Sequence, residues 1–158
     1  MPDTLKSICE QCSQLKTPQL NFVPSERHRQ IILRDLNELV SAAQQEREKT
    51  VALLGGAVLE ALLYSFLQSQ QAYIAQRRGS FVFDPNLSLQ NYVEIFNRWF
   101  RDAMLAPLLT DILVEHRNLV HFNREINSAP GICAIASRDL LRLLDALLAV
   151  MGTFTAAP

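Results

Sequence analysis

The sequence predicts an all-α fold, a helical bundle of about five helices with short connections. Apolar residues recur at spacings of three and four over most of the 158 residues, and strict alternation of apolar and polar residues is almost absent. Helix-breaking residues such as Gly79 and the Pro130-Gly131 pair stand at the ends of these periodic stretches. Hydrophobic residues make up 49% of the chain and charged residues 20%, which is too apolar for intrinsic disorder.

The first half of the chain divides into a leader and two predicted helices. Residues 1–24 form a polar N-terminal leader, and Ser25 is the expected N-cap of a helix that fades near Gln44 to Lys49. A second helix is expected through Val51 and on to about Arg77, with Thr50 either capping or interrupting it. Its first half is apolar nearly all round, as in a central helix.

The second half contains three further predicted helices. Gly79 ends the preceding helix, and residues 80–87 are expected to form an ordered loop or a very short strand. Ser88 is the expected N-cap of a helix through Phe100, and Pro107 suits the first turn of a helix that reaches His121. The last helix spans roughly Ile132 to Phe154, so residues 25–158 are expected to form a single helical domain.

Charge and composition limit the classes of function. Fifteen basic and sixteen acidic side chains leave a net charge of -1, which excludes the overall positive field of a non-specific duplex binder but not a local basic patch. The apolar run from Val51 to Leu67 contains Glu60 and falls short of a spanning helix, so we expect a buried core helix and no membrane partner. The N-terminus lacks the pattern of a signal peptide, and three cysteines cannot all pair within one chain. We therefore expect a soluble protein of the reducing cytoplasm.

One short segment combines residues suited to phosphodiester chemistry. Arg117 and His121 are four residues apart, so on a helix they would project from the same face, one turn apart. An imidazole can move a proton near neutral pH, while a guanidinium grips phosphate oxygens. The structural alternative is a solvated Arg117 and a His121 that contacts a carbonyl at the helix end.

Two segments resemble the HEPN family (higher eukaryotes and prokaryotes nucleotide-binding). Arg117-Asn118 followed by His121, after the amphipathic stretch Leu108 to Val114, resembles the signature of that family, and the helix from Leu54 to Leu63 resembles its core helix with small residues and a Glu. The resemblance implies an α-helical bundle that is often a homodimer. Many members are metal-independent endoribonucleases of toxin–antitoxin, phage defence or RNA-processing systems, and others are inactive interaction modules.

The resemblance implies specific roles for three residues. His121 would move a proton at the ribose 2′-hydroxyl or the leaving 5′-oxygen, Arg117 would stabilise the charged phosphorane, and Asn118 would hold the Arg or the phosphate. Two copies of the site would face each other in a homodimer, with RNA as substrate and with no metal or cofactor. Three residues separate Arg117 from His121, whereas the family usually has four to six. The shorter spacing favours the alternative function, a catalytically inactive dimerisation or interaction module that binds a nucleotidyltransferase-type partner, a cognate antitoxin or another protein.

Glu60 and His116 are the expected supporting residues. A carboxylate within an apolar helix is costly to bury, so Glu60 either reaches the surface or pairs with a cation, for which the resemblance suggests Arg117. His116 is five residues from His121, a spacing that does not bring two helical imidazoles to one zinc ion.

The remaining polar clusters give weaker signals. Cys9 and Cys12 form a single Cys-x-x-Cys, which lacks the further ligands of a zinc site and is interpreted as two ordinary thiols. The basic clusters Arg27-His28-Arg29 and Arg77-Arg78 are candidates for an RNA groove or for solvated helix ends. Trp99 is a candidate for stacking on bases, although its helical spacing with neighbouring phenylalanines favours a core or dimer interface.

Overall fold

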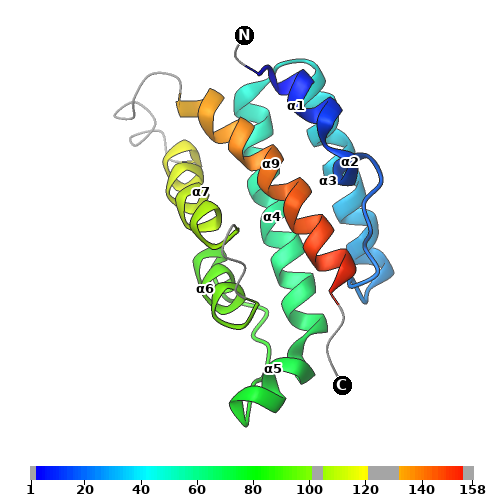
Figure 1. Ribbon diagram of the computed structural model, residues 1–158, viewed down its shortest axis with the longest axis vertical. Helices are drawn as coiled ribbons and strands as arrows, with labels where there is room; N and C mark the ends of the chain where they lie inside the picture. The colour runs from blue at the N-terminus through cyan, green and yellow to red at the C-terminus, as the bar shows by residue number, and fades with distance from the viewer. Residues whose placement is uncertain (1–2, 101–104, 121–131, 155–158) are drawn as a thin grey trace.

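The long helices of the chain run alternately up and down the molecule, and the two short helices nearest the N-terminus pack across one side (Figure 1). The computed structural model describes residues 3–100, 105–120 and 132–154, with residues 113–120 and 132 described by their backbone alone. The helices are α1 (Leu5–Gln11), α2 (Ser13–Lys16), α3 (Glu26–Gln44), α4 (Glu48–Ser69), α5 (Gln71–Arg78), α6 (Leu89–Trp99), α7 (Leu105–Val120) and α9 (Ile132–Thr153). The all-α prediction is confirmed, since the described residues contain eight helices and no strand.

A tight turn makes α3 and α4 antiparallel neighbours. Ser25 caps α3 as predicted, because its side chain accepts a hydrogen bond from the backbone N–H of His28. At the other end Glu46 takes a positive φ of 54°, and the Arg47 N–H donates to the Ala42 carbonyl over 2.9 Å. This three-residue connection turns the chain back, and α3 and α4 pack against each other along their length as an antiparallel pair.

The central helix is α4, which packs against both α3 and α9. Gly55 brings α4 close to α9, since a Cβ at this position would lie only 2.3 Å from Leu140 Cδ2. By length and composition α4 could cross a membrane, but 61% of its most apolar window is buried inside the bundle. The prediction of a buried core helix is therefore confirmed.

The predicted single helix from Thr50 to about Arg77 is wrong in its continuity. At Gln70 the backbone departs from helical angles, with φ of −97° and ψ of 12°, and the chain restarts as α5, which packs beyond the end of α4 (Figure 1). Gly79 then ends α5 with a left-handed φ of 83°, as predicted. Residues 80–87 form a loop rather than a strand, anchored where the Phe83 N–H donates to the Gln71 side chain.

The leader is part of the same core as the rest of the chain. Leu5, Ile8 and Leu15 on α1 and α2 are buried with residues of α3, α4 and α9. Acidic side chains from distant elements cap these short helices. The Glu46 carboxylate accepts the Leu5 and Lys6 N–H groups, and Asp145 on α9 accepts two N–H groups at the start of α2. The described residues therefore contain three helices more than the five predicted, namely α1, α2 and the separate α5.

The second half of the bundle follows the predicted order. Ser88 caps α6 through the Asn91 N–H, and Pro107 lies in the first turn of α7. Phe96 and Phe100 are buried against Phe66, at ring-centroid distances of 5.8 and 4.9 Å. Their burial agrees with the core interpretation of this aromatic spacing.

Candidate functional site

The Arg-Asn-x-x-His segment lies at the C-terminal end of α7. Arg117 and Asn118 are in the last turn of this helix, which is described to Val120, and His121 follows directly but lies outside the described residues. The side chains of His116, Arg117 and Asn118 are also outside the described part of the chain. Because α7 packs on α9 and α4 in antiparallel fashion, its C-terminal end lies beside the first turns of both helices (Figure 1).

Glu60 is exposed at a cleft between α3 and α4. The cleft holds about 310 Å³. Its walls are formed by His28, Ile31, Ile32, Asp35, Ala57, Glu60, Ala61, Tyr64 and Ser65. Of the two alternatives for Glu60, the structure realises the one in which the carboxylate reaches the surface. The predicted pairing of Glu60 with Arg117 stays a prediction, because the Arg117 side chain lies outside the described residues.

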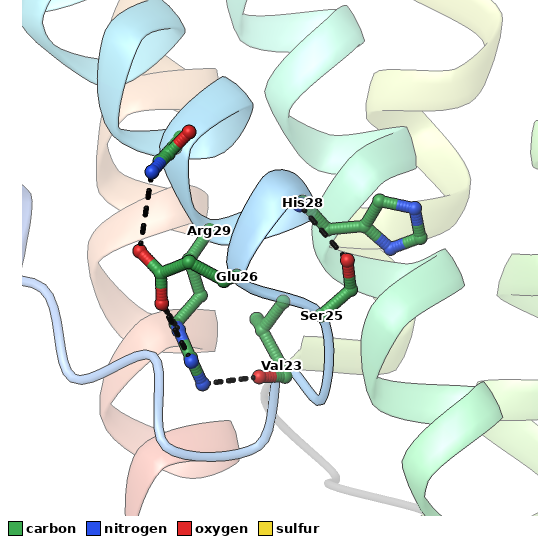
Figure 2. Close-up of polar contacts among 6 residues, drawn as sticks. Val23, Ser25, Glu26, His28 and Arg29 are labelled. Carbon is green, nitrogen blue, oxygen red and sulfur yellow. Dashed lines mark hydrogen bonds and ion pairs between the residues drawn. The ribbon is translucent and has the colours of Figure 1, made fainter.

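His28 points from the first turn of α3 toward α4, whereas Glu26 and Arg29 point away from the cleft (Figure 2). The imidazole meets the ring of Tyr64 edge to face at 5.7 Å between centroids. Its Nδ1 is buried and has no hydrogen-bond partner within the described part of the chain. The cleft therefore places an imidazole and a phenol together on an apolar floor, a pairing that the sequence did not predict.

The charges around this cleft do not suit a phosphodiester. Two carboxylates, Asp35 and Glu60, line it beside His28. Arg34 precedes Asp35, and its guanidinium binds the Asp35 carboxylate over 2.7 Å. Carboxylates repel phosphate, so this cleft is better suited to a cationic or neutral group.

Tyr92 closes the aromatic wall behind Tyr64. The two rings lie 6.1 Å apart, and the Tyr92 hydroxyl donates to the Asp84 carbonyl over 3.3 Å. Burial raises the pKa of Tyr92 above its ordinary value, so the phenol remains protonated and keeps its role as a donor. Tyr92 is thereby a structural support of the wall.

The first basic cluster is divided among different contacts. Arg29 binds Glu26 in the first turn of α3 over 2.7 Å and donates to the carbonyl of Val23, which precedes the helix, over 2.8 Å (Figure 2). Arg27 is exposed, and His28 turns into the cleft. The three residues do not line one groove together.

Arg78 of the second basic cluster and Trp99 meet at a groove. It holds about 690 Å³ between the end of α5, the last turns of α6 and the start of α7. The groove is lined by Arg78, Glu94, Ile95, Asn97, Arg98, Trp99 and Ala106. Arg77 instead stacks over the Tyr73 ring at 3.6 Å.

Cys9 and Cys12 are buried thiols of the core. Burial raises the pKa of both, that of Cys12 to about 11, so both are protonated at neutral pH. Among the described residues, no group of three His, Cys, Asp or Glu side chains has the arrangement of a metal site. The Cys-x-x-Cys is accounted for by packing against α9, where Cys12 Sγ approaches the Leu141 carbonyl at 3.9 Å.

Comparison with known proteins gives no family for this chain. It matches no family model, no curated protein and no solved structure. Functional inference therefore depends on the residues themselves.

Proposed function

We propose that the chain is a HEPN-like, metal-independent endoribonuclease whose Arg117, Asn118 and His121 act at the interface of a homodimer. The segment that carries the proposal is Arg117-Asn118-Leu119-Val120-His121. Support from the structure is that α7 is helical to Val120 within an all-α bundle, which suits an Arg one turn before a His. The proposed context is a toxin, defence or RNA-processing system.

The proposed reaction is an attack within the substrate. His121 takes the proton of a ribose 2′-hydroxyl, the 2′-oxygen bonds to phosphorus, and the bond from phosphorus to the 5′-oxygen breaks. The alternative role for His121 is to give a proton to the leaving 5′-oxygen, which lies on the opposite side of phosphorus, and in a homodimer the second copy of His121 would serve the other oxygen. Arg117 stabilises the charge that develops on the phosphorane oxygens, and Asn118 holds the Arg or the phosphate. The products are a 2′,3′-cyclic phosphate and a 5′-hydroxyl, so DNA is spared.

Exposed apolar side chains support a dimer at this end of the bundle. Leu53 near the start of α4 and Ile135 near the start of α9 are 40% and 51% exposed. Their neighbours Ala52 and Ala136 are buried and belong to one small cluster, which places the two helix starts together. The C-terminal end of α7 lies beside them (Figure 1). A two-fold contact there would cover both apolar side chains and bring two copies of the motif together.

This interface is tested by Ile135→Glu, which places a charge where an apolar contact is proposed. We expect the wild type to be a dimer and the variant a monomer by light scattering, with an unchanged circular dichroism spectrum. Leu33→Glu is the matched control, because Leu33 is 39% exposed on α3, away from this end. A dimer that persists in Ile135→Glu would contradict the proposed interface.

The catalytic proposal is tested by RNA cleavage in EDTA. We expect the wild type to cleave a labelled single-stranded RNA, and His121→Ala and Arg117→Ala each to lose at least about 100-fold in rate. His28→Gln is the matched control, since this imidazole faces the acidic cleft rather than the motif. Wild-type cleavage that survives in His121→Ala would overturn the role of His121.

The second candidate function is an inactive HEPN-like module that binds a nucleotidyltransferase-type partner, an antitoxin or another protein. The observation that favours it is the spacing, with three residues rather than the usual four to six between Arg117 and His121. A purified wild-type dimer that cleaves no RNA would favour this module. In that case, inserting one residue after Val120 would restore the usual spacing between Arg117 and His121. Cleavage by this variant would show that the short spacing alone prevents catalysis.

A further inference from the structure

The groove between α5, α6 and α7 gathers side chains of several chemistries that the motif does not use. It presents two guanidinium groups, one carboxylate, one amide and one indole around about 690 Å³. The residues come from three different helices, so the chain folds to bring them together. Only Arg78 and Trp99 among them are marked by the sequence pattern.

The two arginines give the groove a net positive charge. Arg78 is the last residue of α5 and Arg98 lies in the last turn of α6, and both are exposed. Glu94 cancels one of the two charges, and its carboxylate accepts the Gln90 side-chain N–H over 3.0 Å. The remaining charge and the planar guanidinium groups suit a phosphate group.

Trp99 supplies a surface for a base. Its side chain is half-buried and packs on the core while it also lines the groove. An indole fixed in this way offers a rigid apolar face at little cost in conformational entropy. Stacking on such a face is a principal source of affinity for unpaired bases.

We propose that this groove binds a short single-stranded segment of RNA, with a phosphate on Arg98 and Arg78 and a base stacked on Trp99. A duplex is excluded because its bases are already stacked and unavailable to the indole. The choice of RNA over DNA rests on the proposed function. Ala106 at the groove and Arg117 are eleven residues apart on α7, so about 16 Å of helix separates the groove from the motif. The groove would therefore hold the substrate to one side of the cleaved bond.

The chain contains a single tryptophan, so its fluorescence reports on this groove directly. The protein is the full-length dimer with His121→Ala, in EDTA, and the probe is a ten-nucleotide single-stranded RNA of mixed sequence. We expect saturable quenching of Trp99. Binding of fluorescently labelled RNA should weaken at least about five-fold in Trp99→Leu and recover in Trp99→Phe, which keeps an aromatic face.

Salt dependence tests the phosphate contact. Arg98→Gln should lower the slope of log K against log salt by about 0.7, the value for one phosphate contact on a single strand. Arg27→Gln is the matched control, because it removes the same charge from an exposed position on α3. The control should leave the slope unchanged.

Three results would overturn the proposal: no quenching, an unchanged slope in Arg98→Gln, or tighter binding of duplex RNA or of a polyglutamate peptide. Its failure is distinguishable from failure of the proposed function. RNA that quenches Trp99 but is not cleaved by the wild type leaves the groove intact and rejects the nuclease. RNA that is cleaved without quenching rejects the groove alone.

Discussion

The contact between Gly55 and Leu140 predicts an unusual response to a small substitution. A Cβ at Gly55 would lie 2.3 Å from Leu140 Cδ2 and 2.7 Å from its Cγ, whereas carbon atoms in contact are about 3.5 to 4.0 Å apart. Leu140 is 2% exposed, so its side chain has little room to move away. Gly55→Ala should therefore push α4 and α9 apart or force Leu140 into a poor rotamer.

The magnitude follows from two opposing contributions. Overpacking of this kind costs about 1–3 kcal/mol, whereas replacing Gly by Ala within a helix gains about 1 kcal/mol. We expect a net loss of about 1 kcal/mol in the free energy of unfolding. Leu140→Ala removes the obstructing atoms and by itself should cost about 2–5 kcal/mol. In that background Gly55→Ala should become stabilising by about 1 kcal/mol, a coupling of about 2 kcal/mol.

The assay is urea unfolding of the wild type, both single variants and the double variant, followed by circular dichroism. Ala57→Gly is the matched control, since Ala57 is exposed on the same helix and its replacement measures helix propensity alone. If Gly55→Ala is equally stabilising in the wild-type and in the Leu140→Ala background, the proposed close contact does not limit the packing of α4 on α9.

Two further predictions concern buried and capping groups. The backbone N–H groups of Lys6 and Leu5 hold the pKa of Glu46 below its usual range, so its stabilisation is present above the unfolded-state pKa and is lost as pH falls through the folded-state pKa. Glu46→Gln should thus lower stability by about 1 kcal/mol at pH 7, with the difference shrinking toward pH 3 in urea titrations; a pH-independent difference would reject this cap. For the thiols, a Cys12 pKa of about 11 leaves about one thiolate in a thousand at pH 8, so Cys9 and Cys12 should be alkylated only after unfolding. Mass spectrometry that finds rapid labelling of either thiol in the folded protein would contradict their burial.

Local signals in the sequence predicted the helix ends well. The side-chain oxygens of Ser25 and Ser88 each accept a hydrogen bond from the backbone N–H three residues further along the chain. Gly79 can adopt a positive φ without strain. Each of these effects depends on only a few neighbouring residues. Helix ends of this kind can therefore be predicted from the sequence alone.

Features set by distant contacts were not predictable in the same way. Helices α1 and α2 carry few apolar residues, and although Thr4 caps α1 locally, both helix starts also donate to carboxylates far away in the sequence, Glu46 for α1 and Asp145 for α2. The break at Gln70 has no Gly or Pro to mark it.

The candidate sites show the same limit. The spacing of Ala57, Glu60, Ala61 and Tyr64 does predict one face of α4, but not that His28 would lie against it. The groove between α5, α6 and α7 likewise depends on how these helices meet, which the position of Arg98 in the sequence does not predict.

The central claim is that Arg117 and His121 promote attack by a ribose 2′-hydroxyl. The most direct test uses a labelled RNA strand and its fully 2′-deoxy counterpart, incubated with the wild-type protein in EDTA, with the product ends identified by mass spectrometry. We expect that only RNA is cleaved, that each 3′ end carries a cyclic phosphate, and that His121→Ala gives no product. Cleavage of the deoxy strand, products without cyclic phosphate, or an intact RNA strand would contradict the claim.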